Sequence, residues 1–422
     1  MSNRAAPVIS FREEPTAVMA PPNRSDIVVF DAVRTPRGKG REGGTLAATP
    51  PVELVKQLIT ALNRRQGEQI RTADHFILGC VGQTGAQGGH IALVSKLHAG
   101  LAESMPAWSL NNFCVSGLSA VLSAAEKVGS GNADVVLAGG VESMSQVPFL
   151  ADKGAYYTDP AFSAALRYVP VALSADVLAH HHNVTRAELD AVALASHLRA
   201  AHAQKENLGQ QSLIPVVDAA GKVVLARDEY VRAGTTLEGL AAFPPAFGSL
   251  GAAYAPILKS ALGLERIDHR HAVVHAPGTA DGAGLAVIGT RDAGAARGLK
   301  PRARIVAMAE AGGDPVLSLT AGRAAMDKVL QRARMTLSDI GVIEYMEAFA
   351  VVPALFYRDH AAHADKVNVF GGHVARGHAL GATGAILLSS LLDVMEHKGV
   401  ALGMVVAFAA SGIGSAVILQ RE

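Results

Sequence analysis

The hydrophobic positions of this chain follow two spacings, one typical of buried strands and one typical of helices with a single apolar face. The first continuous apolar run, DIVVFDAVRTP from Asp26, predicts a buried strand at the start of the globular part. Helix-like and strand-like segments then alternate along the chain. This alternation predicts an α/β fold.

One unit of this pattern occurs twice. After Cys114, apolar residues recur at helical spacing, the turn GSGNAD ends the helix, and VVLAGG predicts a buried strand that ends in glycines. In the C-terminal half, GHALGATGA leads into an apolar helix pattern from Leu387 to Met395, followed by EHKG and the strand VVAFAASGIG. The wide separation of the copies indicates a duplicated α/β domain, with the active site expected between the halves.

Residues 144–279 lie between the two copies and are less regular and richer in loops. Within them, TRAELDAVALASHLRAAHAQ predicts one clear helix, because Thr185 is a candidate N-cap and Glu188 stands three residues later. Long insertions of this kind usually carry contacts to a substrate. We therefore expect residues 144–279 to form a lid or substrate-binding domain.

The ends of the chain and its charge disfavour several classes of protein. Residues 1–26 lack the continuous apolar core of a secretion signal and are expected to form a flexible N-terminal extension. The longest nearly apolar stretch, MVVAFAASGIGSAVIL from Met404, is too short to span a bilayer and predicts two buried strands and a turn. The 38 basic and 37 acidic side chains nearly balance, so neither nucleic acid nor a membrane is expected as a partner.

The two cysteines are too few for a disulfide framework or a cysteine zinc site, which fits a cytoplasmic location. Cys80 stands at a predicted strand end and is expected in the core. Cys114, in NNFCVSGLSA, stands at the start of a predicted helix, where the helix dipole and free N–H groups lower a thiol pKa. Position alone leaves two alternatives open, a nucleophile and a buried thiol.

A nucleophilic cysteine needs a base, and the 16 histidines offer many candidates. The segment GGHVARGHALGATGA is the most suggestive, because its glycines permit close backbone approach around His373 and His378. The triplet at 180–182 and the pair His360 and His363 lack other ligands at metal-binding spacing, so no metal is expected. The sequence also lacks a glycine motif for nucleotide phosphates, and no cofactor is expected.

The segment NNFCVSGLSAVLSAAEKVGSGNADVVLAGGVESMSQVPF closely resembles the nucleophile segment of thiolases, the acetyl-CoA acyltransferases. The resemblance continues in family order through RDEYVRAGTTLEGLAAFPPAF, APGTADGAG, EYMEAFA, VNVFGGHVARGHALGATGA and ASGIG. It implies a five-layered αβαβα fold, built from two duplicated domains and a loop domain. The implied N-terminal domain spans residues 27–143 and 280–300, the loop domain spans 144–279, and the C-terminal domain spans 301–422.

The resemblance also implies a reaction. Cys114 would take an acyl group from an acyl-CoA or another acyl thioester, His378 would assist it, and backbone N–H groups of Cys114 and Ala410 would hold the oxyanion. Pro277 aligns with a serine that meets the pantetheine arm in many members, and Phe349 belongs to the family's Asn-Glu-Ala-Phe motif, so both are candidate substrate contacts. Thiolases are usually dimers or tetramers, which implies a homo-oligomer here.

The sequence departs from the thiolase pattern at positions that serve proton transfer. Phe408 stands where the family has its second catalytic cysteine, and Met346 replaces the asparagine of the Asn-Glu-Ala-Phe motif. Acyl transfer to Cys114 is therefore expected to be intact, whereas proton transfer at the α-carbon is expected to be impaired. Four further positions differ from the residues usual in the family, namely His275, Phe370, His373 and Ala379.

Three functions remain compatible with these departures. We favour a non-standard thiolase-like acyltransferase or condensing enzyme whose acceptor needs no strong base, with Phe349, Phe370 and Phe408 suggesting an apolar acceptor side. The second is an ordinary 3-oxoacyl-CoA thiolase in which Glu347 or His373 replaces the lost proton shuttle. The third is a non-catalytic subunit of a thiolase-like complex, against which the retention of both Cys114 and His378 counts.

Overall fold

The computed structural model describes residues 26–422, so the predicted N-terminal extension lies outside the described residues except for Asp26. The strands are β1 (Ile27–Arg34), β2 (Gly38–Lys39), β3 (His75–Gly79), β4 (Ala107–Leu110), β5 (Val135–Ser143), β6 (Val216–Val217), β7 (Val223–Leu225), β8 (Ala280–Thr290), β9 (Ala303–Gly312), β10 (Val342–Tyr345), β11 (Leu402–Ala409) and β12 (Ile413–Arg421). The α-helices are α1 (Pro51–Gln66), α2 (Ile91–His98), α3 (Ser116–Gly129), α4 (Ala155–Thr158), α5 (Pro160–Ala165), α6 (Val171–His181), α7 (Arg186–Lys205), α8 (Leu237–Ala241), α9 (Gly248–Leu262), α10 (Arg291–Ala296), α11 (Ala321–Ala333), α12 (Val351–Asp359), α13 (His373–Arg376) and α14 (Thr383–Lys398).

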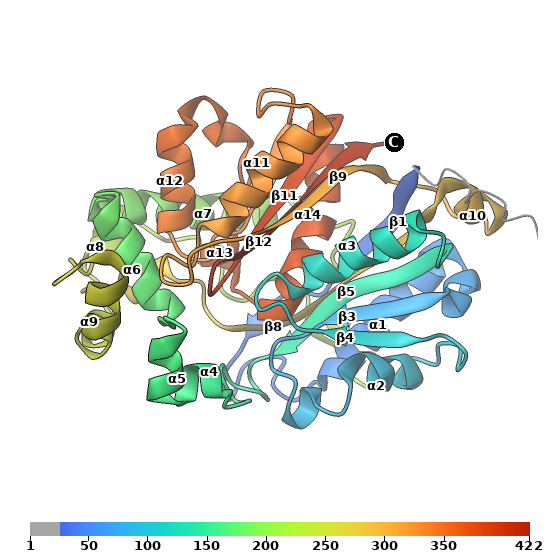
Figure 1. The fold of residues 1–422 in the computed structure, drawn as a ribbon. Coiled ribbons are helices and arrows are strands. Elements are labelled where there is room, and N and C mark those ends of the chain that lie inside the picture. Colours follow the sequence, from blue (N-terminus) through green and yellow to red (C-terminus); the bar gives the residue numbers. More distant parts are fainter. Residues whose placement is uncertain (1–25) are drawn as a thin grey trace, which may run out of the picture.

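The main strands form one path in the order β10-β11-β12-β9-β1-β8-β5-β3-β4, and β2 pairs with β8. This path has two halves, because β1 and β9 pair only at Val28–Arg304 and Val29–Ala303. The N-terminal half carries β1, β8, β5, β3 and β4, and the C-terminal half carries β9 to β12. The two halves lie apart in Figure 1 with helices between them.

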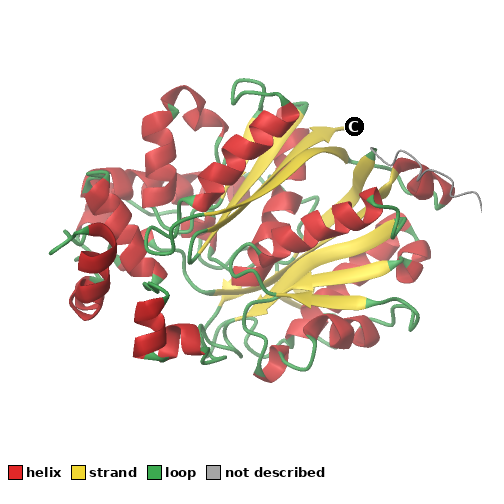
Figure 2. Ribbon diagram, in the orientation of Figure 1, coloured by secondary structure: helices red, strands yellow, loops and turns green. Residues whose placement is uncertain are grey.

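Helices α3 and α14 form the layer between the halves, as Figures 1 and 2 show. Helix α14 packs against β1 and β8 on one side and against β10 and β11 on the other, and every residue from Thr383 to Met395 is buried. Helix α11 covers the outer face of the C-terminal half, and α1 with α2 covers the outer face of the N-terminal half. The predicted five-layered αβαβα fold is therefore confirmed.

The repeated unit appears as α3 followed by β5 and as α14 followed by β11, as the two apolar patterns predict. The stretch from Met404 forms parts of β11 and β12 with a tight turn between them. Among residues 26–422, no helix combines the length and the apolar character needed to cross a membrane.

The insertion begins after β5 ends at Ser143 and finishes where β8 starts at Ala280. Helix α7 begins as predicted, because the Thr185 side chain caps the Glu188 N–H and Glu188 caps the Thr185 N–H. The expectation of a single helix among loops is wrong, because α4, α5, α6, α8 and α9 also lie here. The hydrophobic pattern does not predict helix α6, because residues 173–179 are all buried and this stretch therefore has no polar face.

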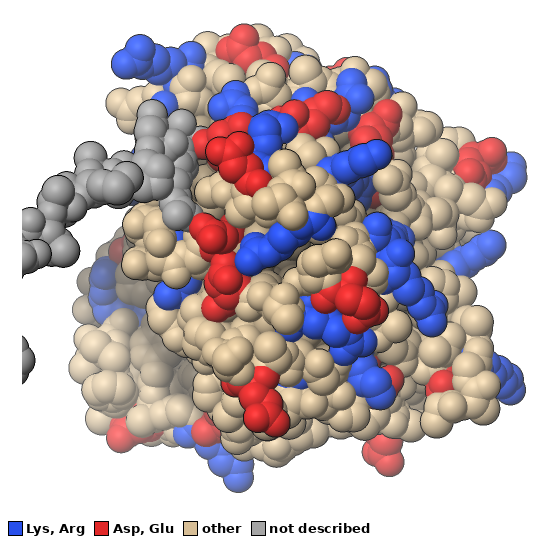
Figure 3. All heavy atoms as spheres, turned by 90° about the vertical axis from the view of Figure 1, so that its right-hand side faces the viewer, with Lys and Arg blue, Asp and Glu red and all other residues tan. Residues whose placement is uncertain are grey.

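Charged side chains of both signs are interspersed on the face drawn in Figure 3, and neither sign forms a broad uniform area there.

Candidate active site

Cys114 lies in the turn between β4 and α3, two residues before the helix begins. Phe113 takes a positive φ of 47°, and its carbonyl accepts hydrogen bonds from the Ser116 N–H at 3.0 Å and the Ser116 hydroxyl at 2.6 Å. These bonds close the turn and fix the Cys114 backbone. The adjacent helix contains Gly117, where a Cβ would lie only 2.6 Å from the carbonyl oxygen of Gly381, so glycine lets the C-terminal loop approach.

His378 lies in that C-terminal loop, and hydrogen bonds hold both its backbone and its ring in place. Its N–H donates to the Gly278 carbonyl at 2.8 Å, and its carbonyl accepts from the Ala280 N–H at 3.1 Å. Its Nδ1 lies 2.8 Å from the Thr383 hydroxyl. Thr383 is the first residue of α14, so the central helix orients the imidazole.

A cavity of about 160 Å³ lies where the two halves and the insertion meet. Its lining includes five residues that the sequence indicates for the site, and most of the other lining side chains are apolar. The structure therefore brings together Cys114, Pro277, Phe349, His378 and Ala410.

Burial dominates the ionisation of the Cys114 and His378 side chains. Burial raises the pKa of the Cys114 thiol to about 12, although N–H groups of Ala410 and of Cys114 itself point at the sulfur and lower it. Burial also lowers the pKa of His378 to about 3, and the nearby positive charge of Arg37 acts in the same direction. The prediction of a lowered thiol pKa is therefore wrong for the free site, because desolvation outweighs the helix N-terminus.

Glu142 is a cavity residue that the sequence reasoning missed. Its carboxylate accepts hydrogen bonds from the N–H groups of Val81 at 2.9 Å, Gly82 at 3.0 Å and Gly381 at 3.0 Å. Burial raises the pKa of Glu142, and these donors oppose the shift. The carboxylate thus ties a loop of the N-terminal half to the C-terminal loop. The available signal was an acidic residue closing the apolar strand run VVLAGGVE.

The two altered family positions do not line the cavity. The Phe408 ring packs against Gly322 of α11 and lies 5.0 Å, centroid to centroid, from the Tyr345 ring. Met346 is fully buried, and its sulfur lies 3.5 Å from the Phe408 backbone nitrogen, which donates to it. Both side chains therefore belong to the core of the C-terminal half.

Glu347 and His373, the two suggested alternative proton shuttles, are also outside the cavity lining. The Glu347 carboxylate accepts from the Ser196 hydroxyl at 2.7 Å, the Asn368 amide at 3.0 Å and the Val374 N–H at 3.0 Å. His373 is buried beside His378, with ring centroids 5.8 Å apart, and neither of its ring nitrogens has a hydrogen-bond partner within the described chain.

Two of the remaining unusual positions, His275 and Phe370, are buried. His275 is fully buried and its Nε2 lies 2.7 Å from a carboxylate oxygen of Asp190. Phe370 packs on Gly209 and on the ring of His397. Neither lines the cavity, so of the three phenylalanines suggested for an apolar acceptor side only Phe349 is placed there. Cys80 is fully buried, as expected.

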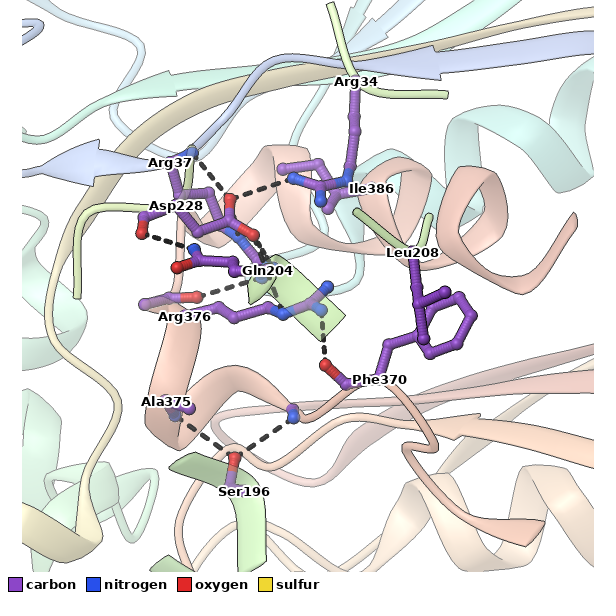
Figure 4. Close-up of polar contacts among 12 residues, drawn as sticks. Arg34, Arg37, Ser196, Gln204, Leu208, Asp228, Phe370, Ala375, Arg376 and Ile386 are labelled. Carbon is purple, nitrogen blue, oxygen red and sulfur yellow. Dashed lines mark hydrogen bonds and ion pairs between the residues drawn. The ribbon is translucent and has the colours of Figure 1, made fainter. Parts of the chain in front are cut away.

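A second carboxylate, that of Asp228 in the insertion, lies among three arginine side chains, one of which is Arg376, two residues before His378 (Figure 4). It accepts from Arg34 at 2.9 Å and from the Arg37 N–H at 2.9 Å, and Arg376 Nε lies 3.7 Å away. Burial opposes ionisation of Asp228, but the three guanidinium groups outweigh it and hold its pKa well below the usual range. Arg37 also donates to the Gly377 carbonyl at 3.2 Å, directly before His378.

Comparison with known proteins identifies the family. Residues 27–257 match the model of the thiolase N-terminal domain, and residues 299–421 match that of the thiolase C-terminal domain. A beta-ketoadipyl-CoA thiolase of Pseudomonas knackmussii is 32% identical over 94% of this chain and 99% of its own. An acetyl-CoA acetyltransferase of Rhizobium meliloti is 34% identical over 94% of this chain and 98% of its own.

Solved structures agree with the sequence comparisons. The acetyl-CoA acetyltransferase of Bacillus anthracis superposes with a TM-score of 0.81 at 29% identity, covering 94% of this chain and 99% of its own. Human mitochondrial 3-ketoacyl-CoA thiolase gives the same TM-score of 0.81 at 28% identity, covering 95% and 100%. Both the sequence and the fold therefore show that this chain belongs to the thiolase family of acyltransferases.

Proposed function

We propose that Cys114 is the nucleophile that accepts an acyl group from an acyl thioester. The sulfur forms a bond to the acyl carbon, the bond from that carbon to the carrier sulfur breaks, and the carrier thiol leaves with the proton that Cys114 gives up. The observation that carries the proposal is the convergence of Cys114, His378 and the Ala410 N–H on one apolar cavity.

Each of these groups has a distinct role in the proposal. The neutral imidazole of His378, oriented through Nδ1 by Thr383, removes the thiol proton at the moment of attack. The N–H groups of Cys114 and Ala410 stabilise the oxyanion that forms on the acyl oxygen. Pro277 and Phe349 form part of the wall that receives the thioester. Because its pKa is raised, the Cys114 thiol keeps its proton in the free site. It gives that proton to His378 only when the thioester is bound and the sulfur attacks.

We further propose that the acceptor of the acyl group needs no strong base. The burial of Phe408 and Met346 outside the cavity supports this, since neither position offers an acid or base to the α-carbon. Suitable acceptors are a β-keto acid that loses carbon dioxide, a carbon that is already acidic, an amine or a hydroxyl. A non-catalytic subunit would have no chemical need for both Cys114 and His378.

One observation favours a second candidate, an ordinary 3-oxoacyl-CoA thiolase with a relocated proton shuttle. Glu142 lines the cavity, and burial raises its pKa, so its carboxyl group is a better candidate shuttle than Glu347 or His373. Its backbone donors favour the carboxylate and oppose protonation. This balance leads us to retain the non-standard acyltransferase as the first candidate.

We also propose a homo-oligomer in the cytoplasm, with the edge strand β4 at the interface. Within residues 26–422, β4 pairs with β3 on one side and has no strand partner on the other. Exposed apolar side chains stand on β4 and on the adjacent α2, namely Leu93, Val94, Leu97 and Trp108. An exposed apolar edge strand is a template for pairing with a second copy. The chain runs from β4 directly to Cys114, so the interface adjoins the site.

The acylation proposal is tested by exposing the full chain to a panel of acyl-CoAs near neutral pH and measuring intact protein mass. We expect one acyl adduct, which Cys114→Ala abolishes and the matched control Cys80→Ala retains. An adduct that persists in Cys114→Ala would assign the nucleophile elsewhere.

A further inference from the structure

The charges that line the cavity at Cys114 are of one sign. Among the described residues, its lining includes the carboxylate side chains of Glu142 and Asp152 but no lysine or arginine. His378, the histidine in the lining, is kept neutral by burial. Any group that enters the cavity therefore meets apolar surface, neutral polar groups or carboxylates.

The wall contributed by the insertion is aromatic and apolar. Residues 147–150, which follow β5, line it together with Tyr157 and Tyr168, whose ring centroids lie 6.1 Å apart. The Tyr157 hydroxyl donates to the Asp152 carboxylate, which is the one charged side chain among the described residues of this wall. Phe149 is 48% exposed and also lines the cavity, which places it at the mouth.

We infer that the acyl group carried by Cys114 is uncharged and apolar, and that acyl thioesters ending in a second carboxylate are rejected. This inference rests on the proposed acylation of Cys114 and names the substrate class of the same site. It separates this chain from its relatives named beta-ketoadipyl-CoA thiolase, whose name states an acyl group with a terminal carboxylate.

The physical reason is the cost of moving a carboxylate out of water without a cation to receive it. A buried charge is tolerated when it is paired or fully hydrogen-bonded, and like charges at close range are strongly disfavoured. Here the terminal carboxylate would lose hydration and face the buried carboxylate of Glu142, or it would lie beside the exposed carboxylate of Asp152. An apolar tail of the same length has no charged group to dehydrate, and it gains contact with Phe149, Tyr157 and Tyr168.

Hexanoyl-CoA and adipoyl-CoA test the inference, because their acyl chains have equal length and adipoyl adds a terminal carboxylate. The rate of adduct formation on Cys114 of the full chain is measured by intact-protein mass. We expect hexanoyl-CoA to react faster by on the order of 100-fold. Asp152→Asn, which removes one repulsive charge, should lower the ratio of the hexanoyl-CoA rate to the adipoyl-CoA rate.

A complementary variant supplies the missing cation. Phe149→Lys places an ammonium at the mouth and should raise the adipoyl rate about tenfold, the change typical of one favourable charge contact. Phe162→Lys is the matched control, because Phe162 is 47% exposed but does not line the cavity, and it should leave the ratio unchanged. Equal rates for both probes on the unmodified chain would overturn the inference alone. Absence of an adduct from both probes would overturn the proposed acylation and the inference with it.

Discussion

The two histidines of GGHVARGHA differ in what their rings reach. His378 lines the cavity with Cys114 and is oriented by Thr383, whereas His373 is buried behind it without a hydrogen-bond partner in the described chain. We expect His378→Ala to slow acylation of Cys114 by about 10²–10⁴, the usual contribution of a general base. His373→Ala should slow it much less. Rapid-quench mass measurements compare the two, and equal losses would mean that the base is not His378.

The raised thiol pKa has a measurable consequence for the free site. With a Cys114 pKa of about 12, the thiolate is the minor form at neutral pH, and each added pH unit multiplies it tenfold. The rate of Cys114 alkylation by iodoacetamide should therefore rise steadily with pH through the range in which the protein stays folded. Subtracting the rate for Cys114→Ala removes any contribution of Cys80. A plateau near neutral pH would indicate a thiolate already formed in the resting protein.

The sequence motifs select Cys114 and His378, which line one cavity in the structure, but they do not reveal the surroundings of these residues. Glu142 and Asp228 were missed because the N–H and guanidinium groups that explain them come from distant parts of the chain. The direction of the Cys114 pKa was wrong for a related reason. A helix N-terminus can be seen in a sequence, whereas the burial that outweighs it depends on the tertiary structure.

At the scale of elements, the loop that carries His378 depends on Asp228. The substitution Asp228→Asn removes the negative charge that pairs with three buried guanidinium groups. Breaking a buried ion pair in this way typically lowers the free energy of unfolding by about 3–5 kcal/mol. We expect a loss of this size in the free energy of urea unfolding at neutral pH. The exposed Asp365→Asn is the matched control and should change little.

The same substitution has a defined pH dependence. The pKa of Asp228 is depressed in the folded chain, so its contribution to stability is present above the unfolded pKa of about 3.9 and is lost as pH falls below it. The stability difference between the unmodified chain and Asp228→Asn should therefore shrink below about pH 4. A difference that is constant or grows on acidification would contradict the ion-pair account.

Whether a helix or strand can be predicted from the sequence depends on how its residues are exposed to solvent. Helix α7 and strand β5 were predicted because a cap or a bounded apolar run marks them, and the apolar pattern also predicted α14. Helix α6 was not, since burial on nearly every side leaves no periodic polar face. Helix α9 contains Pro256, a residue that normally argues against a helix.

At the scale of the whole molecule, the repeated unit predicted two similar halves with the site between them. The pairing of β1 with β9, which joins the halves into one strand path, was not predictable, because local patterns do not specify strand order. The surface beyond β4 supplies a prediction at this scale.

Leu97→Glu places a charge on the exposed apolar face of α2 and should shift the protein toward monomer in sedimentation velocity. Leu198→Glu, at another exposed position, on α7, is the control and should leave the oligomer intact. An oligomer that is insensitive to Leu97→Glu would place the interface on another face.

We propose that acyl transfer to Cys114 is retained while proton transfer at the α-carbon is lost. Acetyl-CoA and acetoacetyl-CoA both give the acetyl adduct of Cys114, but only cleavage of acetoacetyl-CoA expels a carbanion that must be protonated. The most direct test is the rate of this one adduct from each substrate, measured by rapid-quench intact mass. We expect acetoacetyl-CoA to react more slowly than acetyl-CoA by on the order of 10³–10⁴, near the larger single effect of losing an acid or an oxyanion donor. Equal rates would contradict it and would identify the protein as an ordinary thiolase with a relocated proton shuttle.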